Sequence, residues 1–438
     1  MYQKVLAAAL LVIVAFLLAF SICQGDLLQF RLAATESVDS GQVPQQSYFG
    51  LTAWLPPDAA NYSKPWMNSP YRFDTLPADV VAALGVLFPT KHVANSAGSL
   101  VVTVHGPHGG LGDRVRGVYA CAMAALLTNR ILLIEPSILL KQEDPQGVDA
   151  SVIDTKECYK RIVSTALSSR ASVRIATNCV WQDKYTQLAI DVLPGALSPK
   201  RSAAVQAMLS HCGGSLKVGD LSQSNCADYA GTGCYEIPRA YQCGPMLLHA
   251  AYATQQPEMA QLLWSVHALY STWRTVLAPK GYNAIHFRTG HSTLHLDKSM
   301  TLPSTPWPDA EWCGERCTSW LQAGDSIAKQ HKPTLPVAIS SDSTIMIGLL
   351  QSRMWNSLRL LHCCAGAVHV ARGGAISHEQ DMSILQQNLF DLVMMGGAKR
   401  LFVDLGHFWS LGLFWWGNST DTQVHIDRGP ATTIPLLQ

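Results

Sequence analysis

Residues 100–117, with the sequence LVVTVHGPHGGLGDRVRG, hold the pattern that decides the fold. The β-branched run at 100–104 predicts a buried strand, and the glycine-rich stretch at 105–112 predicts a loop. Apolar residues then recur at helical spacing from 115 to 126, and a second apolar strand is expected at 131–135. Strand, glycine loop, helix and strand in this order predict a βαβ unit.

The carboxyl-terminal half repeats this alternation. Helical spacing of apolar residues from 243 to 277 predicts a long helical segment that links the two halves. Beyond it, we expect short strands at 282–287, 337–340, 368–370 and 401–403, alternating with helices at 344–353, 382–395 and 411–416. Such alternation is typical of a second parallel α/β sheet.

The first residues predict a membrane anchor. Val5–Cys23 is a nearly unbroken apolar run that is long enough to cross a bilayer. Lys4 before it favours a cytosolic N-terminus, with the remainder of the chain translocated. A cleaved signal peptide, which would leave a secreted protein, is the alternative. The proline-containing stretch from Asp26 to about Ser99 has little periodicity and is expected to be a stem.

Composition favours a lumenal glycoprotein over a nucleic-acid-binding protein. The 32 Lys and Arg residues against 31 Asp and Glu leave no basic surplus for a phosphate backbone. Sequons at Asn61 and Asn418, together with 12 cysteines, suit the glycosylating and oxidising lumen of the endoplasmic reticulum or Golgi. Disulfides are therefore expected; a zinc site is the alternative, but the chain has no Cys-x-x-Cys pair. Cys121 lies in apolar surroundings and is expected to be a buried thiol.

The glycine-rich loop can bind an anion. It follows a strand and opens a helix, so its backbone N–H groups can face a phosphate, and Arg114 and Arg116 add cationic donors. Two other interpretations stay open: a tight turn that only packs the helix on its sheet, and a dinucleotide-binding loop with Glu135 near the ribose position. Val115 counts against the second, because that fingerprint needs glycine or alanine there.

The expected strand at 284–287 ends in Arg288, at the edge of a parallel sheet that faces ligands. Its planar guanidinium suits a diphosphate, because the fixed fork can neutralise charge that builds on a departing nucleoside diphosphate. The alternative is a surface arginine after an edge strand, with His286 simply facing the core.

Taken together, these segments resemble the fucosyltransferase superfamily of GDP-fucose-dependent enzymes, which includes α1,6-, plant cell-wall, nodulation and protein O-fucosyltransferases. The resemblance spans most of residues 99–417. It is carried by the glycine loop Gly109–Arg114 with the helix and strand at 126–134, by His286–Arg288 as a His-x-Arg motif, by Ser341–Ser343 as a strand-end Ser/Asp pair, and by Gly406–Ser410 as a late strand-to-helix turn.

This resemblance implies a GT-B-like α/β fold in which two Rossmann-like domains face a cleft, after an N-terminal membrane anchor. The expected division is an anchor at 1–25, a stem at 26–98, an N-terminal Rossmann-like domain at 99–278 and a C-terminal donor-binding domain at 279–438. The residues that the resemblance assigns to the donor are Gly109, Gly110, Gly112, Arg114, His286, Asp342 and Ser410.

The implied reaction is inverting transfer of fucose from GDP-fucose, the donor substrate, to a glycan or glycoprotein, with no cofactor. No Asp-x-Asp triplet occurs in the chain, so the sequence does not require a metal. Arg288 and the loop amides must then stabilise the leaving GDP. His108 and Asp113, beside the loop, are candidates for the general base, although Asp113 is equally well placed to cap the helix.

Two features depart from the family pattern. Members commonly carry an acidic residue soon after the His-x-Arg strand, where this chain has Thr289–His291. The late turn is also rich in tryptophan, with Trp409, Trp415 and Trp416. The missing acid favours, as an alternative, an inactive lumenal carbohydrate-binding protein of the same fold. A dinucleotide-dependent oxidoreductase is the third hypothesis.

Overall fold

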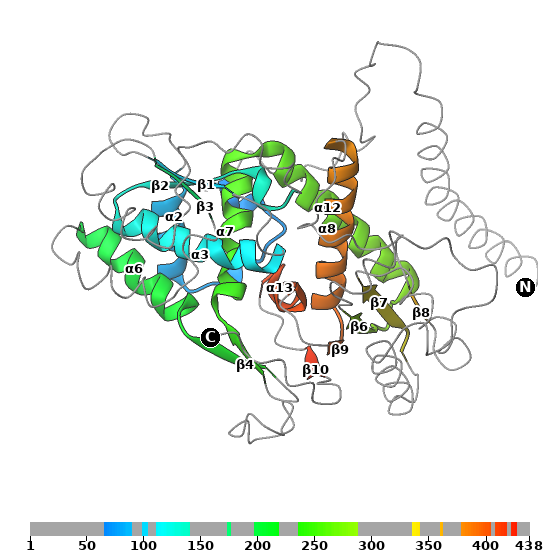
Figure 1. Ribbon diagram of the computed structural model, residues 1–438. Coiled ribbons are helices and arrows are strands. Elements are labelled where there is room, and N and C mark those ends of the chain that lie inside the picture. The colour runs from blue at the N-terminus through cyan, green and yellow to red at the C-terminus, as the bar shows by residue number, and fades with distance from the viewer. Residues whose placement is uncertain are drawn as a thin grey trace, which may run out of the picture. The chain divides into compact units, whose positions relative to one another are not determined.

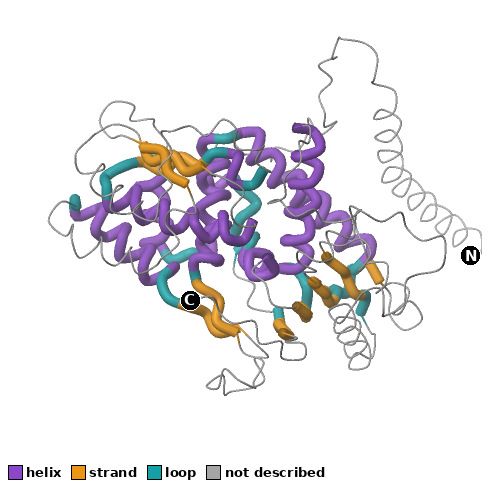
Figure 2. The backbone as a smooth tube through the Cα atoms, in the orientation of Figure 1, coloured by secondary structure: helices purple, strands orange, loops and turns teal. Residues whose placement is uncertain are grey.

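Parallel sheets and the helices that cover them form the fold (Figures 1 and 2). The computed structural model describes residues 65–89, 99–103, 111–140, 173–176, 197–218, 235–287, 335–341, 360–361, 378–403, 408–417 and 422–426. The chain divides into a unit Met1–Ala53 and a unit Trp54–Gln438, and every described residue belongs to the second unit.

The first sheet is built around the strand that precedes the glycine loop. Its strands are β1 (Ser99–Thr103), β2 (Ile131–Ile134) and β3 (Val173–Ala176), in the order β2-β1-β3 with every pair parallel. The strands expected at 100–104 and 131–135 are therefore confirmed. The residues 173–176 lack a distinctive pattern, and their strand was not expected.

Helix α3 (Leu111–Leu127) follows the glycine loop and is buried along almost its whole length. It packs mainly against α7 (Ala240–Gln255) and also against α6 (Pro199–Cys212). The approach of α3 and α7 is close, because a Cβ at Gly244 would collide with the carbonyl oxygen of Val115. From Gly117 to Leu127 the helix is apolar on all sides, and such a helix belongs in a core.

Part of the expected stem is packed into this core. Residues 65–89 form η1 (Pro65–Asn68), η2 (Phe73–Thr75) and α2 (Ala78–Leu87), and α2 lies against α6. Trp66, Tyr71 and Phe73 are buried. Irregular backbone with isolated aromatic residues has no periodicity, which is why the sequence did not reveal this packing.

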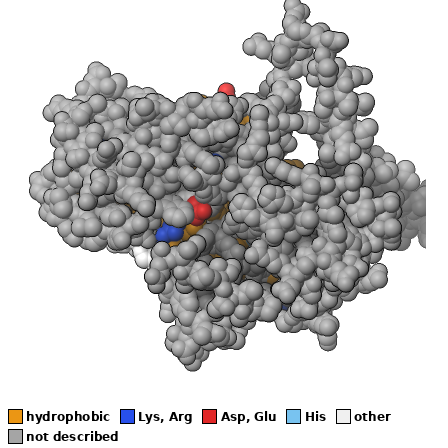
Figure 3. All heavy atoms as spheres, viewed as in Figure 1, with side chains coloured by type: hydrophobic (Ala, Val, Ile, Leu, Met, Phe, Trp, Pro, Cys, Tyr) orange, Lys and Arg blue, Asp and Glu red, His pale blue; other side chains and the backbone are white. Residues whose placement is uncertain are grey.

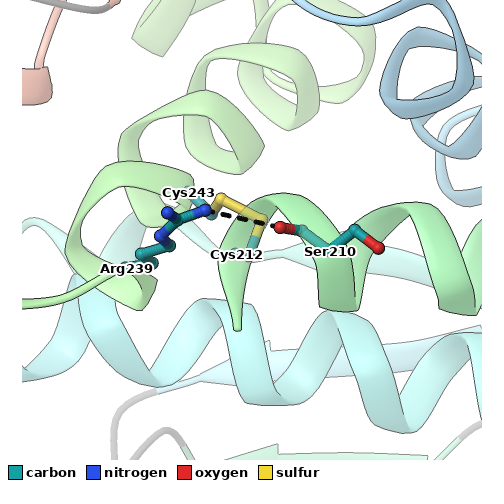
Figure 4. The surroundings of a disulfide bond; sticks show 4 residues. All are labelled: Ser210, Cys212, Arg239 and Cys243. Atoms are coloured by element: carbon teal, nitrogen blue, oxygen red, sulfur yellow. Dashed lines mark hydrogen bonds between the residues drawn. A yellow bond between two sulfur atoms is a disulfide. The ribbon is translucent and has the colours of Figure 1, made fainter. Parts of the chain in front are cut away.

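One disulfide joins the helices around the first sheet. Cys212 at the end of α6 and Cys243 in α7 are bonded, with Cα atoms 5.7 Å apart, and the Arg239 guanidinium beside them donates to the carbonyl oxygen of Ser210 at 3.4 Å (Figure 4). This confirms the expectation of disulfide bonding, and Cys121 is a buried free thiol as expected. Between the two bonded cysteines lie β4 (Ser215–Val218) and β5 (Tyr235–Pro238), which pair antiparallel.

The long helical segment expected at 243–277 is two helices. Helix α7 ends at Gln255 and α8 (Pro257–Leu277) begins at a proline. Proline lacks a backbone N–H and disfavours a helical conformation in the residue before it, so Pro257 favours a break at Gln256 and the start of a new helix. The helical spacing expected at 243–277 is therefore confirmed, with an interruption at Gln256.

The second sheet has five parallel strands, in the order β10-β9-β6-β7-β8. They are β6 (Asn283–Phe287), β7 (Val337–Ser341), β8 (Leu360–Leu361), β9 (Arg400–Val403) and β10 (Gln423–Ile426). Helices α12 (His378–Gly396) and α13 (Phe408–Phe414) pack together, and α12 also lies along α8 (Figure 1). The strands expected at 282–287, 337–340 and 401–403 and the helices at 382–395 and 411–416 are confirmed.

Other expectations concern residues that the structure does not describe. The helix at 344–353, the strand at 368–370 and the sequons at Asn61 and Asn418 lie outside the described ranges, as does the apolar run Val5–Cys23. None of the described helices is long and apolar enough to span a membrane. The mixed α/β class with parallel sheets is established, whereas the anchor, the domain boundaries and the arrangement as two domains stay predictions.

Candidate functional site

The strand order indicates where each of the two parallel sheets is expected to bind a ligand. The chain leaves β6 for β7 and β8 on one side of the sheet, and later returns to form β9 and β10 on the other side. In open α/β sheets, ligands bind outside the carboxyl ends of the strands where the order reverses in this way. In the first sheet, β1 holds the same interior position between β2 and β3. The glycine loop follows β1 directly, and Arg288 follows β6 directly.

His286 lies on β6, two residues before Arg288, and its side chain is buried with an exposed fraction of 4%. Its Nδ1 is 3.2 Å from the hydroxyl oxygen of Ser340, the residue paired with it on β7. The imidazole ring also lies 5.5 Å from the ring of Phe408, the first residue of α13. The beginning of α13 is therefore beside the end of β6, as the strand order requires.

A carboxylate completes this contact. The Ser340 hydroxyl donates to Oδ2 of Asp391 on α12 at 2.9 Å, and the amide of Gln387, one helical turn earlier, donates to Oδ1 at 3.2 Å. Asp391 and Ser340 are both buried. Burial raises the pKa of Asp391 to about 7, and the hydrogen bonds from Ser340 and Gln387 oppose that rise. We call His286, Ser340 and Asp391 the β6 network.

Ser410, predicted to bind the donor, is the third residue of α13 and is fully buried. Its hydroxyl has no hydrogen-bond partner among the described residues. The structure therefore brings His286 and the helix that carries Ser410 together through Phe408. A role of Ser410 in binding a donor stays a prediction.

The beginning of α3 holds three other predicted residues. Gly112 and Asp113 are the second and third residues of the helix, and Oδ1 of Asp113 accepts a hydrogen bond from the Tyr241 hydroxyl at 3.4 Å. An acidic side chain in a first turn interacts favourably with the helix dipole. The Arg116 guanidinium lies 5.7 Å from the centre of the Tyr241 ring. Asp113 is thus tied to α7 as well as to its own helix.

Arg114 points into the protein. Its guanidinium is buried, and Nη1 donates to the carbonyl oxygen of Leu140 at 2.8 Å, just after η3 (Pro136–Ile138). This contact ties the start of α3 to the segment that follows β2. A contact of Arg114 with a diphosphate stays a prediction.

The remaining predicted site residues, His108, Gly109, Gly110, Arg288 and Asp342, lie outside the described ranges. In the chain they directly follow elements that the structure does describe: β7 ends at Ser341, and the glycine loop lies between β1 and α3. Among the described residues, no group of three or more His, Cys, Asp or Glu side chains could hold a metal ion.

Sequence reasoning missed Ser340, Asp391 and Gln387. Asp391 did leave a signal, because it is the one acid in the apolar run Leu389–Met395 of an otherwise buried helical pattern. Charged residues are almost never fully buried unless they are paired. A lone acid on the buried side of a helix therefore indicates a polar partner in the sheet below.

A second buried histidine lies away from the sheet. His249 of α7 has its Nδ1 2.7 Å from the hydroxyl oxygen of Ser69, and that oxygen accepts a hydrogen bond from the backbone N–H of Tyr71 at 3.3 Å. The rings of Tyr71, Trp415 and Trp416 surround it at 5.4, 5.5 and 5.3 Å. Burial lowers the pKa of His249 to about 3. We call His249, Ser69 and these rings the aromatic cluster.

On the face drawn in Figure 3, described side chains reach the surface only in small areas, mainly apolar with some acidic and basic atoms. The contacts of the β6 network are buried.

Comparison with known proteins gives a remote likeness in structure alone. No protein-family model matches the sequence, and no curated protein matches it. Among solved structures, a mutant of Arabidopsis thaliana FUT1 in complex with GDP is 11% identical over 81% of this chain and 75% of that one, with a TM-score of 0.38. The fucosyltransferase NodZ from Bradyrhizobium is 9% identical over 73% and 92%, with a TM-score of 0.32. POFUT1 in complex with GDP-fucose is 10% identical over 78% and 100%, with a TM-score of 0.30.

Proposed function

We propose that this protein is a glycosyltransferase that transfers fucose from GDP-fucose to a glycan or glycoprotein, with inversion and without a metal ion. One observation carries the proposal. The His-x-Arg segment, His286–Arg288, spans the carboxyl end of the strand at which the order of a five-stranded parallel sheet reverses. That position is where such sheets bind nucleotides.

Arg288 supplies the chemistry in this proposal. A departing GDP gains negative charge on its diphosphate as the glycosidic bond breaks. A guanidinium fork meets two oxygens of such a group at once, and it stabilises the transition state more than the ground state. Asp342, which follows the neighbouring strand β7, and Ser410, on the helix after β9, come from the same edge of the sheet and would contact the rest of the donor.

The glycine loop is the second part of the proposed site. Gly109, Gly110 and Gly112 follow β1, the interior strand of the first sheet, and lead into α3. Backbone N–H groups at the start of a helix attract anions. For deprotonation of the acceptor, His108 and Asp113 are the two candidates, and Asp113 is already held by the hydroxyl of Tyr241.

Two other functions are alternatives to glycosyl transfer. A sugar-binding protein without activity is favoured by Thr289–His291, where an acidic residue is common in the family that the chain resembles. A dinucleotide-dependent oxidoreductase is disfavoured by Val115, which is fully buried against Gly244 of α7. Its side chain fills the space that the dinucleotide fingerprint keeps free for close helix packing.

We also propose that the protein acts on the lumenal side of a Golgi or endoplasmic reticulum membrane, held by Val5–Cys23. The Cys212–Cys243 disulfide supports an oxidising compartment. Amidase treatment of protein from a glycosylating host should increase its mobility in gel electrophoresis, because Asn61 and Asn418 would both carry glycans. A protein whose mobility does not change would contradict this orientation.

The test of the activity uses purified full-length protein and a panel of nucleotide sugars, with chelator present. We expect consumption of GDP-fucose alone, and a GDP-dependent rise in the unfolding temperature. Stabilisation by UDP or CMP instead, or by GDP only with manganese, would exclude the fucosyltransferase assignment. GDP binding without donor turnover on any glycan or glycoprotein acceptor would favour the inactive sugar-binding protein.

A further inference from the structure

We infer that Asp391 is a positioning residue: through Ser340, it holds the proton of His286 on Nδ1. The contacts that support this assignment are the 2.9 Å hydrogen bond from Ser340 to Asp391 and the 3.2 Å contact between Ser340 and Nδ1 of His286. The role of His286 in sugar transfer rests on the proposed function, whereas the position of its proton does not.

The number of hydrogens that Ser340 can donate fixes the position of this proton. A serine hydroxyl has one hydrogen to donate and two lone pairs that can accept. Ser340 donates its hydrogen to Asp391, since an ionised carboxylate can only accept. Its contact with His286 must then be one in which Ser340 accepts, and Nδ1 of His286 carries the hydrogen. Gln387 donates to the other carboxylate oxygen. This contact holds Asp391 in the orientation in which it accepts from Ser340.

The aromatic cluster is the control for this count, because no acid among the described residues lies behind its serine. Ser69 already accepts the backbone N–H of Tyr71, and it faces no carboxylate in the described part of the chain. Ser69 therefore keeps its hydrogen and a second lone pair for Nδ1 of His249, 2.7 Å away, and either neutral tautomer of His249 satisfies this contact. The acid behind Ser340 fixes the tautomer of His286, whereas no acid that the structure describes fixes that of His249.

This assignment restricts what His286 can bind. In the neutral ring, Nε2 carries a lone pair, so it accepts a hydrogen bond from a hydroxyl and cannot donate to a diphosphate oxygen. If the proposed donor binds at this edge, His286 is suited to a sugar or ribose hydroxyl. The contacts with the phosphates are then left to Arg288 and the glycine loop.

The position of the proton can be measured in full-length protein labelled with ¹⁵N-histidine. Nitrogen chemical shifts and two-bond couplings distinguish the tautomers, and H286Q and H249Q assign the two signals by their loss. The spectra are recorded at about pH 8, where Asp391 is ionised. We expect His286 protonated on Nδ1, and the His249 signal serves as the internal reference. A wild-type His286 protonated on Nε2 alone would overturn the inference.

Variants test whether Asp391 is the cause. D391L keeps the approximate side-chain volume but removes the acceptor, and S340A removes the bridge; both should allow His286 to take up the Nε2–H form. D391N keeps an acceptor oxygen and should largely preserve Nδ1–H. His249 should be unchanged in all three, which also reports that the fold is intact. Should D391L fail to fold, S340A decides, and an unchanged His286 signal in it would refute the relay.

Activity separates this inference from the proposed function. D391L should lower fucose transfer on the order of tenfold, with D391N recovering much of the loss and the exposed control D79N unaffected. A locked tautomer in a protein that transfers no sugar would leave the inference intact and reject the proposed function. Full transfer activity in D391L with an altered tautomer would instead reject the positioning role.

Discussion

Two histidines are buried in the described part of the chain, and each is bonded through Nδ1 to a serine, yet the two differ in what lies behind that serine. In the β6 network, Ser340 passes its hydrogen to the carboxylate of Asp391. In the aromatic cluster, Ser69 accepts a backbone N–H two residues along. One serine therefore links His286 to a group that titrates, and the other links His249 to the backbone.

This difference separates a site that can take part in chemistry from one that holds the fold together. The β6 network lies at the end of the strand that leads into Arg288. The aromatic cluster joins residues 65–73 to α7 and to the two tryptophans that follow α13, and the N–H of Arg72 donates to the carbonyl oxygen of Trp416 at 3.0 Å. A histidine among aromatic rings with a neutral partner has no charge to relay. We therefore expect substitutions in the two regions to have different consequences.

The largest effect is expected beside the β6 network, at Arg288. Replacing it with alanine should lower transfer by about 100- to 1,000-fold with no change in unfolding temperature, because it meets charge that develops only as the bond breaks. Arg288→Lys should lose nearly as much, since an ammonium cannot contact two oxygens in the same way. Steady-state rates with GDP-fucose check this.

The matched control is Arg400, which is exposed at the amino end of β9, the opposite edge of the same sheet. Arg400→Ala should retain full activity. Activity of R288A within severalfold of the wild type would remove the basis for placing chemistry at this end of β6.

The pH dependence of stability should show opposite signs for the two regions. The pKa of Asp391 is raised from 3.8 to about 7, so the folded state holds its proton more tightly and stability falls as the pH rises across that window. The pKa of His249 is lowered from 6.5 to about 3, so stability falls as the pH drops across that window. Each contribution is at most about 5 kcal/mol.

These contributions oppose each other between about pH 4 and 6.5, so the wild type should have a nearly flat profile there. D391N should reveal a stability that increases with pH, and H249Q one that decreases. Urea unfolding at a series of pH values measures both. If the two variants gave the same slope, the comparison between the two regions would fail.

Removing each serine should have a smaller effect, but one that differs between the two regions. Ser340→Ala leaves an ionised acceptor without one of its donors and should lower the free energy of unfolding by about 2 kcal/mol at about pH 8, where Asp391 is ionised. Ser69→Ala involves neutral partners only and should lower it by about 1 kcal/mol. Only S340A should also reduce transfer. Equal losses of activity in the two variants would indicate that neither region is specific to the reaction.

The smallest effect is expected at Gln387. Its amide donates to Asp391 at 3.2 Å, and Gln387→Ala should lower stability by about 1 kcal/mol near neutral pH, because the carboxylate loses one hydrogen bond. The pKa of Asp391 should rise further. An NMR titration of the labelled Asp391 carboxyl carbon measures that rise, and a lower pKa in this variant would contradict the direction of the contact.

Much of the fold could be predicted because its signals are local. Strands β1, β2, β6, β7 and β9 are short apolar runs, and α3 and α12 have apolar residues at helical spacing. Pro257 also carried a usable signal, and the break between α7 and α8 could have been placed from it. Strands β3, β4 and β5 were missed because four residues of mixed polarity do not show a period.

Only those residues of the site that adjoin a predicted strand or helix in the sequence could be predicted. His286 and Arg288 were identified because they end an apolar strand in a parallel sheet, and the glycine loop because it joins a strand to a helix. Asp391, in contrast, looks like one polar residue in a helix until the sheet beneath it is known. From the sequence alone, its partner Ser340 is only a polar residue near the end of a predicted strand.

The sequence by itself determined the alternation of strands and helices, the parallel class of the two larger sheets and the residues that lie at their strand ends, because side-chain period and backbone restrictions act over a few residues. Only the tertiary structure decided that β6 is the central strand and that residues 51 apart, Ser340 and Asp391, share a hydrogen bond. It also decided that Ser69 meets His249, 180 residues away. Burial creates these pairs, because a polar group removed from water is stable only beside a partner that packing brings to it.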